Sequence, residues 1–418
     1  MNDFLLIIRP IFSFIPSVTD LPMHLTIMAP LHQTKFNDDF QKQLLTLKQN
    51  GVDSISTDIW WDHVEYKKNK YDWRNARNWL ESLKKQDLLW IPILAFHTCG
   101  HNVNDDFTVD LPNYIKKEYM ESPFETSKGD TITEYVSFWN NDIYLRYEKF
   151  IKSFRDEFRD DLKFIKKIYI SMGPAGELRF PSYNMNIGWK YSHPGYLVCY
   201  SDVAKNDFQQ YLRTKFIDIN TLNSELDSHY TTFDEINPPY HNNTFFLQFQ
   251  YTSPYGRCVL DWYQSVLHLH FEKMAKLCNR ILRSTKIPLG AKLSGVHWKY
   301  HVGRLAEKAT GYVDETYIKI IRLFSKHNFE LTITCLEMNN NEESGIDDII
   351  QSIDLVAKAY DVNIFGENAL PLHSGYEIGW KNVYRNLTEY AFRGFTLLRW
   401  SNVFCDDDVI VLEKLKII

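Results

Sequence analysis

Residues 164–173 read FIKKIYISMG, and residues 174–183 continue as PAGELRFPSY. The first segment is rich in β-branched and aromatic side chains, which predicts a strand buried on both faces. The second segment opens with proline and glycine and places the carboxylate of Glu177 just after the predicted strand. The sequence thus combines a predicted buried strand with a glycine-containing turn and a charged side chain at the end of the strand.

The same combination recurs along the chain, with helical patterns between the apolar runs. Tyr255–Leu282 carries apolar residues at steps of three and four, the spacing of a helix with one apolar face. Phe36–Gln49 is a second such segment, and Gly51 after it is a helix stop signal. Eightfold alternation of strands and helices predicts a (β/α)8 TIM barrel of the α/β class. The predicted strands are Met23–Pro30, Asp53–Trp60, Leu89–Phe96, Phe164–Gly173, Ile287–Ser294, Phe329–Leu336, Val362–Gly366 and Gly394–Trp400, and the other predicted helices are Thr316–His327, Asp347–Ala359 and Lys381–Phe392.

Two connections are much longer than the others. They are Gly100–Asn141, after the third predicted strand, and Pro174–Pro254, after the fourth. Long loops in a compact domain are usually functional, and in a TIM barrel the loops that follow the strands build the active site. We therefore predict that the loops after strands three and four form the active-site region. No Gly/Ser- or Pro-rich linker is visible, so we expect a single catalytic domain over residues 22–418.

The composition is that of a globular protein: 44% of the 418 residues are hydrophobic and 24% are charged. The net charge of -6 gives no electrostatic reason to bind nucleic acid. Aromatic residues make up 15% of the chain. They suit both a large core and a carbohydrate site, and composition alone does not separate the two. We expect no nucleic-acid or membrane partner, and a monomer.

The N-terminal segment is ambiguous. Phe4–Val18 is apolar but is interrupted by an arginine and two prolines, and Asp3 stands where an export signal would carry positive charge. The run is also too short to span a membrane. Residues 1–21 are either an atypical export signal or a docked tail. The second interpretation is favoured, and with it a cytoplasmic rather than a secreted protein.

The cysteines and histidines do not predict a metal or cofactor. None of the six cysteines forms a C-x-x-C motif, and six are too few for a disulfide scaffold in a chain of this length. We expect most of them to be buried thiols. His268 and His270 lie two positions apart on a predicted helix, so they point in different directions.

Two carboxylates stand at predicted strand ends, each close to a glycine: Glu177 after the fourth strand and Glu367 after the seventh. Either one alone could be a structural ion-pair partner. Together, at the rim where barrel catalysis occurs, an acid and a base are the minimal apparatus for glycoside hydrolysis. Further polar or aromatic candidates at the strand ends are Asp58, His97, Asp105, Lys292, His297, Trp298, Thr334, Asn368, Ala369, Leu370 and Arg399.

The motifs around these residues resemble bacterial-type β-amylases, glycoside hydrolase family 14. GPAGELR-x-PSY together with ENAL is the most specific part of the resemblance, and the matching segments follow the family order over roughly residues 22–400. The segments are GVDSISTDIWWDHVE at 51–65, FHTCGHNVNDD at 96–106, GPAGELRFPSY at 173–183, AKLSGVHWKY at 291–300, TCLEM at 334–338, GENAL at 366–370 and GFTLLRW at 394–400.

The resemblance implies an activity and a role for each candidate. The family cuts α-1,4-glucan from its non-reducing end and releases β-maltose with inversion, which implies Glu177 as general acid and Glu367 as general base. Inversion needs room for a water, so the two carboxyl groups are expected roughly 6.5–9.5 Å apart. The implied substrate contacts are Asp58, His97, Asp105 and Arg399 at the closed end of the pocket, Lys292, His297 and Trp298 beside the scissile bond, Thr334 in a mobile inner loop, and Asn368, Ala369 and Leu370 along the glucan.

The chain departs from the family at its lid. The family typically has glycine where this chain has His101 and Asn104. Glycine hinges easily, but Asn and His tolerate a positive φ better than most residues, so we expect the lid to close. Relatives can pair the lid cysteine with a cysteine eight positions on. That position is Phe107, so Cys99 is expected to be a free thiol.

A structural calcium, which bacterial relatives hold, is the less favoured alternative here. Glu65 and Glu148 match two of its ligands, but Asn69 and Leu145 stand where carboxylates are needed. A hard cation requires several oxygen ligands, so we expect no cofactor and no metal. The chain ends soon after Arg399, so we also expect no C-terminal starch-binding domain.

Two other functions stay open. The chain could be a catalytically inactive β-amylase-like protein that binds or senses glucan, although both glutamates and the surrounding contacts are present. It could instead be a retaining barrel glycosidase, whose carboxyl groups would lie only about 5–5.5 Å apart. Maltose release from soluble starch, and the anomer released first, distinguish these functions.

Overall fold

The computed structural model describes residues 23–418 except 101–106, 241, 300–303, 405–407 and 417. The predicted N-terminal segment 1–21, the candidate Asp105 and Cys405 therefore lie outside the described residues. Within the described part, no helix combines the length and the apolar character needed to cross a bilayer.

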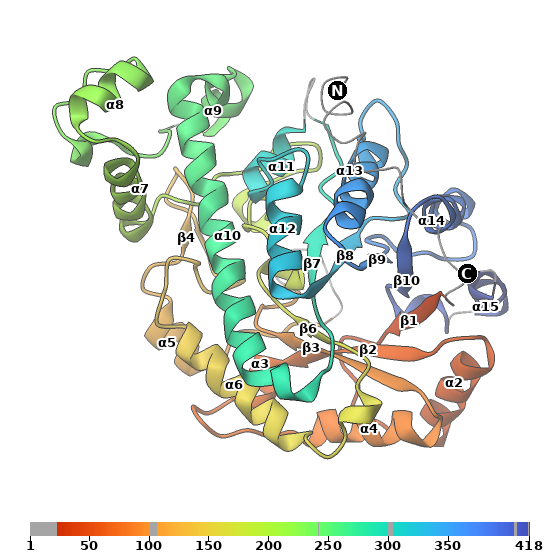
Figure 1. The fold of residues 1–418 in the computed structure, drawn as a ribbon. Helices are drawn as coiled ribbons and strands as arrows, with labels where there is room; N and C mark the ends of the chain where they lie inside the picture. Colours follow the sequence, from red (N-terminus) through yellow and green to blue (C-terminus); the bar gives the residue numbers. More distant parts are fainter. Residues whose placement is uncertain (1–22, 101–106, 241, 300–303, 405–407, 417) are drawn as a thin grey trace.

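Eight parallel strands close into a barrel in the order β1-β10-β9-β8-β7-β6-β3-β2 (Figure 1). Each of the eight predicted runs overlaps one of these strands, so the predicted (β/α)8 barrel is confirmed. The strands are β1 His24–Met28, β2 Ser54–Trp60, β3 Leu89–Ala95, β6 Ile168–Ile170, β7 Leu289–Ser294, β8 Phe329–Thr334, β9 Ile364–Glu367 and β10 Phe392–Leu397.

The barrel closes between its first and last strands. His24 on β1 pairs with Gly394 on β10. A Cβ atom at Gly394 would lie 2.6 Å from the carbonyl oxygen of His24, closer than real Cβ atoms approach, so this position requires glycine. On the other side of β10, the register against β9 is irregular between Phe392 and Phe395.

Helices cover the outside of the barrel (Figure 1). The five predicted helices are all present as α2, α10, α12, α13 and α14, whereas the other helices, α4 and α6 among them, were not predicted. In α4, four buried residues recur at helical spacing, namely Ala76, Trp79, Leu80 and Leu83, so the sequence did carry the signal for it. The helices are α2 Asp38–Gln49, α3 Trp61–Val64, α4 Arg74–Lys85, α6 Tyr144–Glu157, α10 Pro254–Leu282, α11 Leu305–Thr310, α12 Ile318–His327, α13 Ile346–Ala359, α14 Glu377–Glu389 and α15 Asp408–Leu415.

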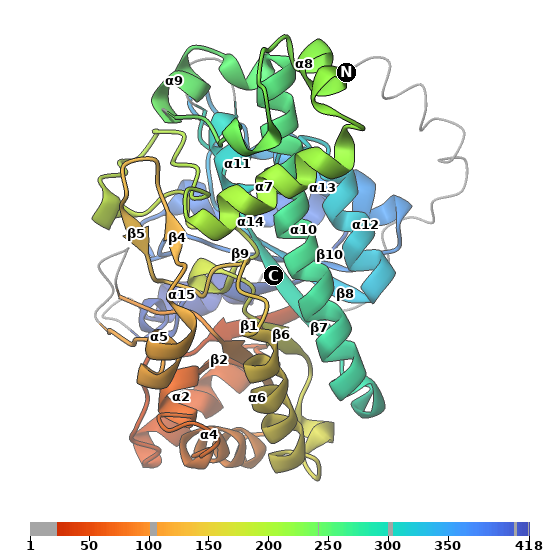
Figure 2. The same cartoon turned by 90° about the vertical axis from the view of Figure 1, so that its left-hand side faces the viewer.

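The two long connections contain their own secondary structure. The first holds α5 (Asn113–Tyr119) and a small hairpin, β4 (Phe124–Glu125) and β5 (Thr131–Ile132). The second holds α7 (Asp202–Lys215), α8 (Ile219–Leu226) and α9 (Asn242–Leu247), which gather around the first half of α10 (Figures 1 and 2). These insertions are therefore folded parts of the domain.

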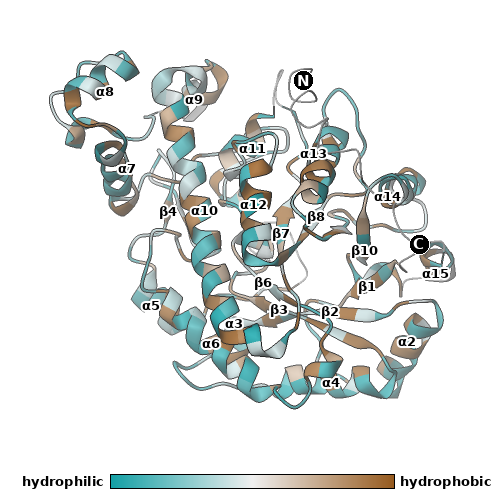
Figure 3. Ribbon diagram, in the orientation of Figure 1, coloured by the Kyte–Doolittle hydropathy of each residue, from teal (hydrophilic) through white to brown (hydrophobic). Residues whose placement is uncertain are grey.

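The aromatic excess lies largely in the core. The largest fully buried side chains include Trp61, Trp90, Trp262 and Trp380. Inside the barrel, the hydroxyl groups of Tyr169 and Thr332 are 2.5 Å apart, which links β6 to β8 across the interior. Figure 3 shows that the outward surfaces of α4 and α6 are mainly hydrophilic. The core therefore accounts for most of the aromatic composition.

Candidate active site

A tight turn after β6 positions Glu177. Ala175 and Gly176 have positive φ values of 54° and 78°, which reverse the chain over a single short turn. A Cβ at Gly176 would lie 3.3 Å from the imidazole of His97, so glycine lets the turn pack against that ring. The amide of Leu178 then donates to the carbonyl of Lys292 on β7 at 2.8 Å. The turn thus joins Glu177 to the end of the next barrel strand.

The Glu177 carboxyl is buried and contacts three donors. Its Oε2 accepts from Nε of Arg179 at 2.8 Å and from the hydroxyl of Tyr183 at 3.4 Å. Its Oε1 accepts from the hydroxyl of Thr334 on β8 at 2.6 Å. The guanidinium of Arg179 is itself 2% exposed, so it faces this carboxyl with little competition from water. Such a group can give up a proton and leave a stabilised carboxylate.

Glu367 ends β9 and has a different environment. Nζ of Lys292 lies 2.8 Å from its Oε1 and 2.6 Å from its Oε2, and both side chains are buried. Two charge-assisted hydrogen bonds of this kind fix the orientation of the carboxyl group. Its backbone is also held, because the amide of Cys335 donates to the carbonyl of Glu367 at 2.8 Å.

The two glutamates belong to one polar network. Thr334 is the register partner of Glu367 across β8 and β9, while its hydroxyl reaches Glu177. Lys292 forms a backbone bridge with Glu177 and sends its ammonium to Glu367. The barrel therefore brings both carboxyls to the same rim, connected through one threonine and one lysine.

His97 follows β3 beside this network. Its Nδ1 is 2.8 Å from the hydroxyl of Ser171, and its ring meets Trp60 edge-on at 5.3 Å. Burial, together with the positive charges of Lys292 and Arg179, lowers the pKa of His97 to about 3. The imidazole is therefore neutral near neutral pH and acts as a hydrogen-bonding group rather than a charge.

His297 and Trp298 follow β7. Nδ1 of His297 lies 2.8 Å from the hydroxyl of Ser344, and burial lowers the pKa of His297 to about 4. The indole of Trp298 donates to the carbonyl of His193 at 3.2 Å. Three rings from the long insertion after β6 lie 5.3–5.9 Å from the Trp298 ring, namely Tyr183, Trp189 and Tyr191. These three were not among the predicted site residues. The clustering of aromatic residues in one long loop that was predicted to be functional could have indicated them.

The segment after β9 is held by two buried side chains. The side-chain amide of Asn368 accepts from the backbone of Leu398 at 2.8 Å and donates to the carbonyls of Leu370 and Leu398. Glu337, which was not predicted as a site residue either, accepts from the amides of Ala369 and Leu370 at 2.9 and 2.5 Å. Burial raises the pKa of Glu337 to about 7. Asn368 thus joins the ends of β9 and β10, while Leu370 is 50% exposed and free to contact a ligand.

Two further candidates lie at the ends of neighbouring strands. Asp58 is half-buried near the end of β2 and lines a small hollow with Trp60 and His63. Arg399 follows β10, and its guanidinium donates to the carbonyl of Ala29, just after β1, at 3.2 Å. Both therefore lie on the β10-β1-β2 side of the barrel.

The ends of the predicted lid are described, although Asp105 itself is not. Cys99 and Val109 exchange backbone hydrogen bonds of 3.0 and 3.2 Å, which close the base of the segment. Gly100 has a φ of 81°, and a Cβ there would lie 2.4 Å from the carbonyl of Phe107. Phe107 stacks on His32 at 5.0 Å. Cys99 forms no disulfide with any described residue.

An arginine lies where the resemblance implied calcium. Glu65 is fully buried, and its carboxylate pairs with the guanidinium of Arg146, which is 2% exposed. The same carboxylate accepts from the indole of Trp61 and the amide of Asn69 at 2.9 and 2.8 Å. Glu148 instead pairs with Lys152 and Arg280. The described residues contain no group of three or more acidic, His or Cys side chains arranged to hold a metal ion.

Comparison with known proteins identifies the family. The profile described as "Glycosyl hydrolase family 14" matches residues 26–413. A β-amylase of Cytobacillus firmus is 34% identical over 91% of this chain and 83% of its own length. A β/α-amylase of Paenibacillus polymyxa is also 34% identical, and this chain spans 32% of that longer protein. The crystal structure of the catalytic domain of the β-amylase from Paenibacillus polymyxa superimposes with a TM-score of 0.86 at 33% identity, over 92% of this chain and 94% of that one. The chain therefore belongs to glycosyl hydrolase family 14 and is a glycoside hydrolase of the β-amylase type.

Proposed function

We propose that this protein hydrolyses α-1,4-glucan from the non-reducing end and releases β-maltose with inversion. The observation that carries the proposal is the contrast between two buried carboxyls on one rim. Glu177 is hydrogen-bonded by Thr334, Arg179 and Tyr183, whereas Glu367 is paired on both oxygens by Lys292. Different surroundings allow one carboxyl to act as an acid and the other as a base.

In the proposed reaction, Glu177 gives its proton to the glycosidic oxygen as the bond to the anomeric carbon breaks. Glu367 takes a proton from water as the water oxygen bonds to that carbon from the opposite face. Arg179 stabilises the carboxylate left on Glu177. Lys292 contacts both oxygens of Glu367 and fixes the orientation of this carboxyl group. No covalent intermediate forms.

The remaining candidates suit a polyhydroxylated substrate. Neutral His97, together with Asp58, Asp105 and Arg399, is proposed to hold the terminal glucose units through hydrogen bonds. Trp298, His297 and the exposed side chain of Leu370 are proposed to contact the units beyond the scissile bond, with Thr334, Asn368 and Ala369 shaping that side. Aromatic faces stack on the apolar faces of sugar rings, and Trp298 sits within such a group.

Exo-action follows if the pocket is closed at one end. We propose that the segment joined at Cys99 and Val109 covers the terminal glucose and brings Asp105 to it. A dead-end pocket accepts chain termini and excludes internal segments, which accounts for release of a short product.

We further propose that the protein works as a monomer, without a metal or cofactor. The Arg146 guanidinium supplies the positive charge that the buried Glu65 carboxylate requires. The net charge of -6 gives no reason to expect a nucleic-acid partner.

The decisive experiment is ¹H NMR of soluble starch with the protein added. Evolution of β-maltose before mutarotation supports the proposal. An α-anomer formed first would indicate a retaining glycosidase, and glucan binding without any maltose would indicate an inactive binding protein. Cleavage of a glucan blocked at its non-reducing end would contradict the closed pocket.

A further inference from the structure

A surface hollow outside the barrel rim carries features of a sugar-binding site. It has a volume of about 590 Å³ and lies between the loop before α4, the first turns of α4 and the end of α6. A second hollow of about 630 Å³ adjoins it, because Tyr71, Trp73 and Glu157 line both. None of the candidate catalytic or substrate-binding residues lines either hollow.

The wall shared by the two hollows is aromatic. The rings of Tyr71 and Trp73 are nearly parallel, with centroids 6.4 Å apart and planes inclined by 15°. Tyr66 adds a third ring at the edge of the first hollow, and it is 54% exposed. Trp73 is only 6% exposed, so Tyr66 and the half-buried Tyr71 are the rings of this wall that a ligand can reach. Flat rings beside an open hollow match the apolar faces of pyranose units.

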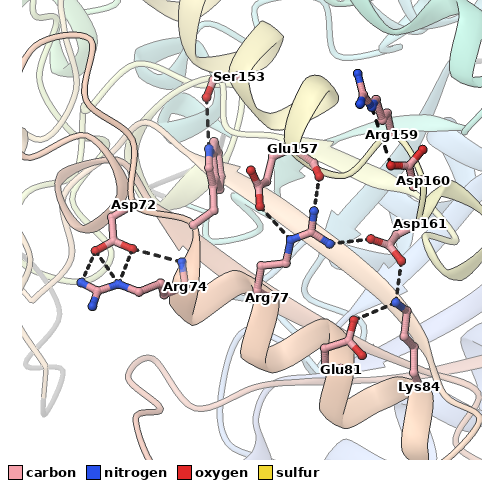
Figure 4. Close-up of polar contacts among 11 residues, drawn as sticks. Asp72, Arg74, Arg77, Glu81, Lys84, Ser153, Glu157, Arg159, Asp160 and Asp161 are labelled. Carbon is pink, nitrogen blue, oxygen red and sulfur yellow. Dashed lines mark hydrogen bonds and ion pairs between the residues drawn. The ribbon is translucent and has the colours of Figure 1, made fainter.

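The two arginines that line the first hollow are both ion-paired, while Lys70 lines the same hollow and Lys149 the adjoining one. Nε of Arg74 lies 2.9 and 3.0 Å from the two carboxylate oxygens of Asp72. Arg77 pairs with Glu157 at 2.7 Å and with Asp161 at 2.5 Å (Figure 4). Because each guanidinium already has a carboxylate partner, neither offers the uncompensated charge that a phosphate or polyanion requires. The remaining N–H donors of the guanidinium groups and the remaining lone pairs of their carboxylate partners can still bind vicinal hydroxyl groups.

The hollow is also preformed. The indole of Trp73 donates to the hydroxyl of Ser153 on α6 at 3.0 Å, and its ring packs against Phe150 and Phe154 below it. The Arg77 ion pairs join α4 to the end of α6 (Figure 4). A rigid site needs little ordering when a ligand binds.

We propose that the hollow lined by Tyr66, Tyr71, Trp73 and Arg74 is a second binding site, which takes an internal segment of an α-glucan chain. The choice of glucan as ligand rests on the proposed function. A polymer whose terminus enters the catalytic pocket has many other segments, and a second contact raises the effective concentration of its ends near the pocket. The second site therefore increases the rate of hydrolysis of long glucans and has no effect on the hydrolysis of short ones.

The test uses Tyr66→Ala and Tyr71→Leu, alone and combined, in the full chain. Leucine keeps apolar volume over Phe150 while removing the flat ring. Tyr240→Ala is the matched control, since Tyr240 is an 81% exposed tyrosine that lines neither hollow. Thermal unfolding checks that each variant is folded. Native electrophoresis through gels containing glycogen measures polymer binding, and kcat/KM is measured on maltoheptaose and on amylopectin.

We expect the double variant to bind glycogen about five- to tenfold more weakly, as the loss of aromatic contacts implies. Its kcat/KM should fall on amylopectin and stay within twofold on maltoheptaose. Equal retardation of wild type and double variant, or an equal loss on both substrates, would overturn the second site. Competition of glycogen binding by inorganic phosphate would also overturn it, in favour of an anion site. If the wild type proves inactive on both substrates but its retardation depends on Tyr66 and Tyr71, the proposed activity fails and the second site stands.

Discussion

The hydroxyl of Thr334 donates to Oε1 of Glu177 at 2.6 Å, across 157 positions of sequence. Thr334 is also the register partner of Glu367 on the next strand. One small side chain thus connects the proposed acid to the strand that carries the proposed base. Loss of the Thr334 hydroxyl would remove a contact to the proposed acid and leave the Lys292 pair of the proposed base in place.

Glu177→Gln should abolish turnover and leave glucan binding largely intact. The amide keeps the shape of the carboxyl but has no acidic proton, and positioned acid catalysis contributes roughly 10²- to 10⁴-fold. The measurements are kcat for maltose release and the dissociation constant for maltoheptaose. Retention of more than about a tenth of the wild-type kcat, a loss below the catalytic range, would contradict the role of Glu177.

Thr334→Val should lower kcat about 10- to 100-fold, because hydrogen bonds to charged groups contribute about 1.5–3 kcal/mol. Valine has nearly the shape of threonine, so packing at the end of β8 is preserved. Thr334→Ser, which keeps the hydroxyl, is the control and should recover most of the activity. Equal kinetics for the serine and valine variants would show that the hydroxyl has no part in placing Glu177.

Addition of EDTA should leave the melting temperature unchanged, because Arg146 already neutralises Glu65. Arg146→Met should lower the free energy of unfolding by about 3–5 kcal/mol, since it leaves a buried carboxylate without its partner. Thermal and urea unfolding measure both effects. A drop in melting temperature on chelation that calcium reverses would reveal a bound cation.

The stability of the protein should fall as the pH is lowered from about 7 to 4. Burial lowers the pKa of His270 to about 3, whereas an unfolded histidine titrates near 6.5. The unfolded state therefore binds more protons between these values, and the stabilisation present above pH 6.5 is lost as the pH falls.

His270→Gln isolates this effect. Glutamine can still donate to the carbonyl of Met172 and accept from the hydroxyl of Tyr144, as the imidazole does. Between pH 7 and 4 the wild type should lose about 3 kcal/mol more of its unfolding free energy than the variant. An equal change in the free energy of unfolding of the two proteins across this pH range, measured with urea, would show that His270 titrates normally.

A bulky thiol reagent should inhibit the enzyme through Cys99. This thiol is half-buried at the base of the lid, whereas Cys199, Cys258, Cys278 and Cys335 are buried. Modification would obstruct lid closure rather than remove a nucleophile, since inversion needs none. Cys99→Ala should keep substantial activity and lose the sensitivity. If Cys99→Ala is as inactive as Glu177→Gln, the thiol takes part in the chemistry.

The sequence by itself determined the barrel and the identity of the candidate residues. Buried parallel strands are continuous apolar runs, and this local signal marked all eight of them. The polar residue that follows each run must lie on the common rim, so the amino-acid sequence is enough to name Glu177 and Glu367 together. The helical signal of α4 is equally local, since its buried residues recur at helical spacing, yet that helix was not predicted.

Only the tertiary structure decided which side chains meet. Lys292 could have paired with either glutamate, and the register of β7, β8 and β9 directs its ammonium to Glu367. Arg146 and Glu65 are 81 positions apart, and their ion pair forms because α6 packs against Trp61 of α3. Such pairings depend on distances across the closed barrel, which no local periodicity encodes. The lowered pKa of His97 has the same origin, since burial and its two cationic neighbours arise only when distant segments pack together.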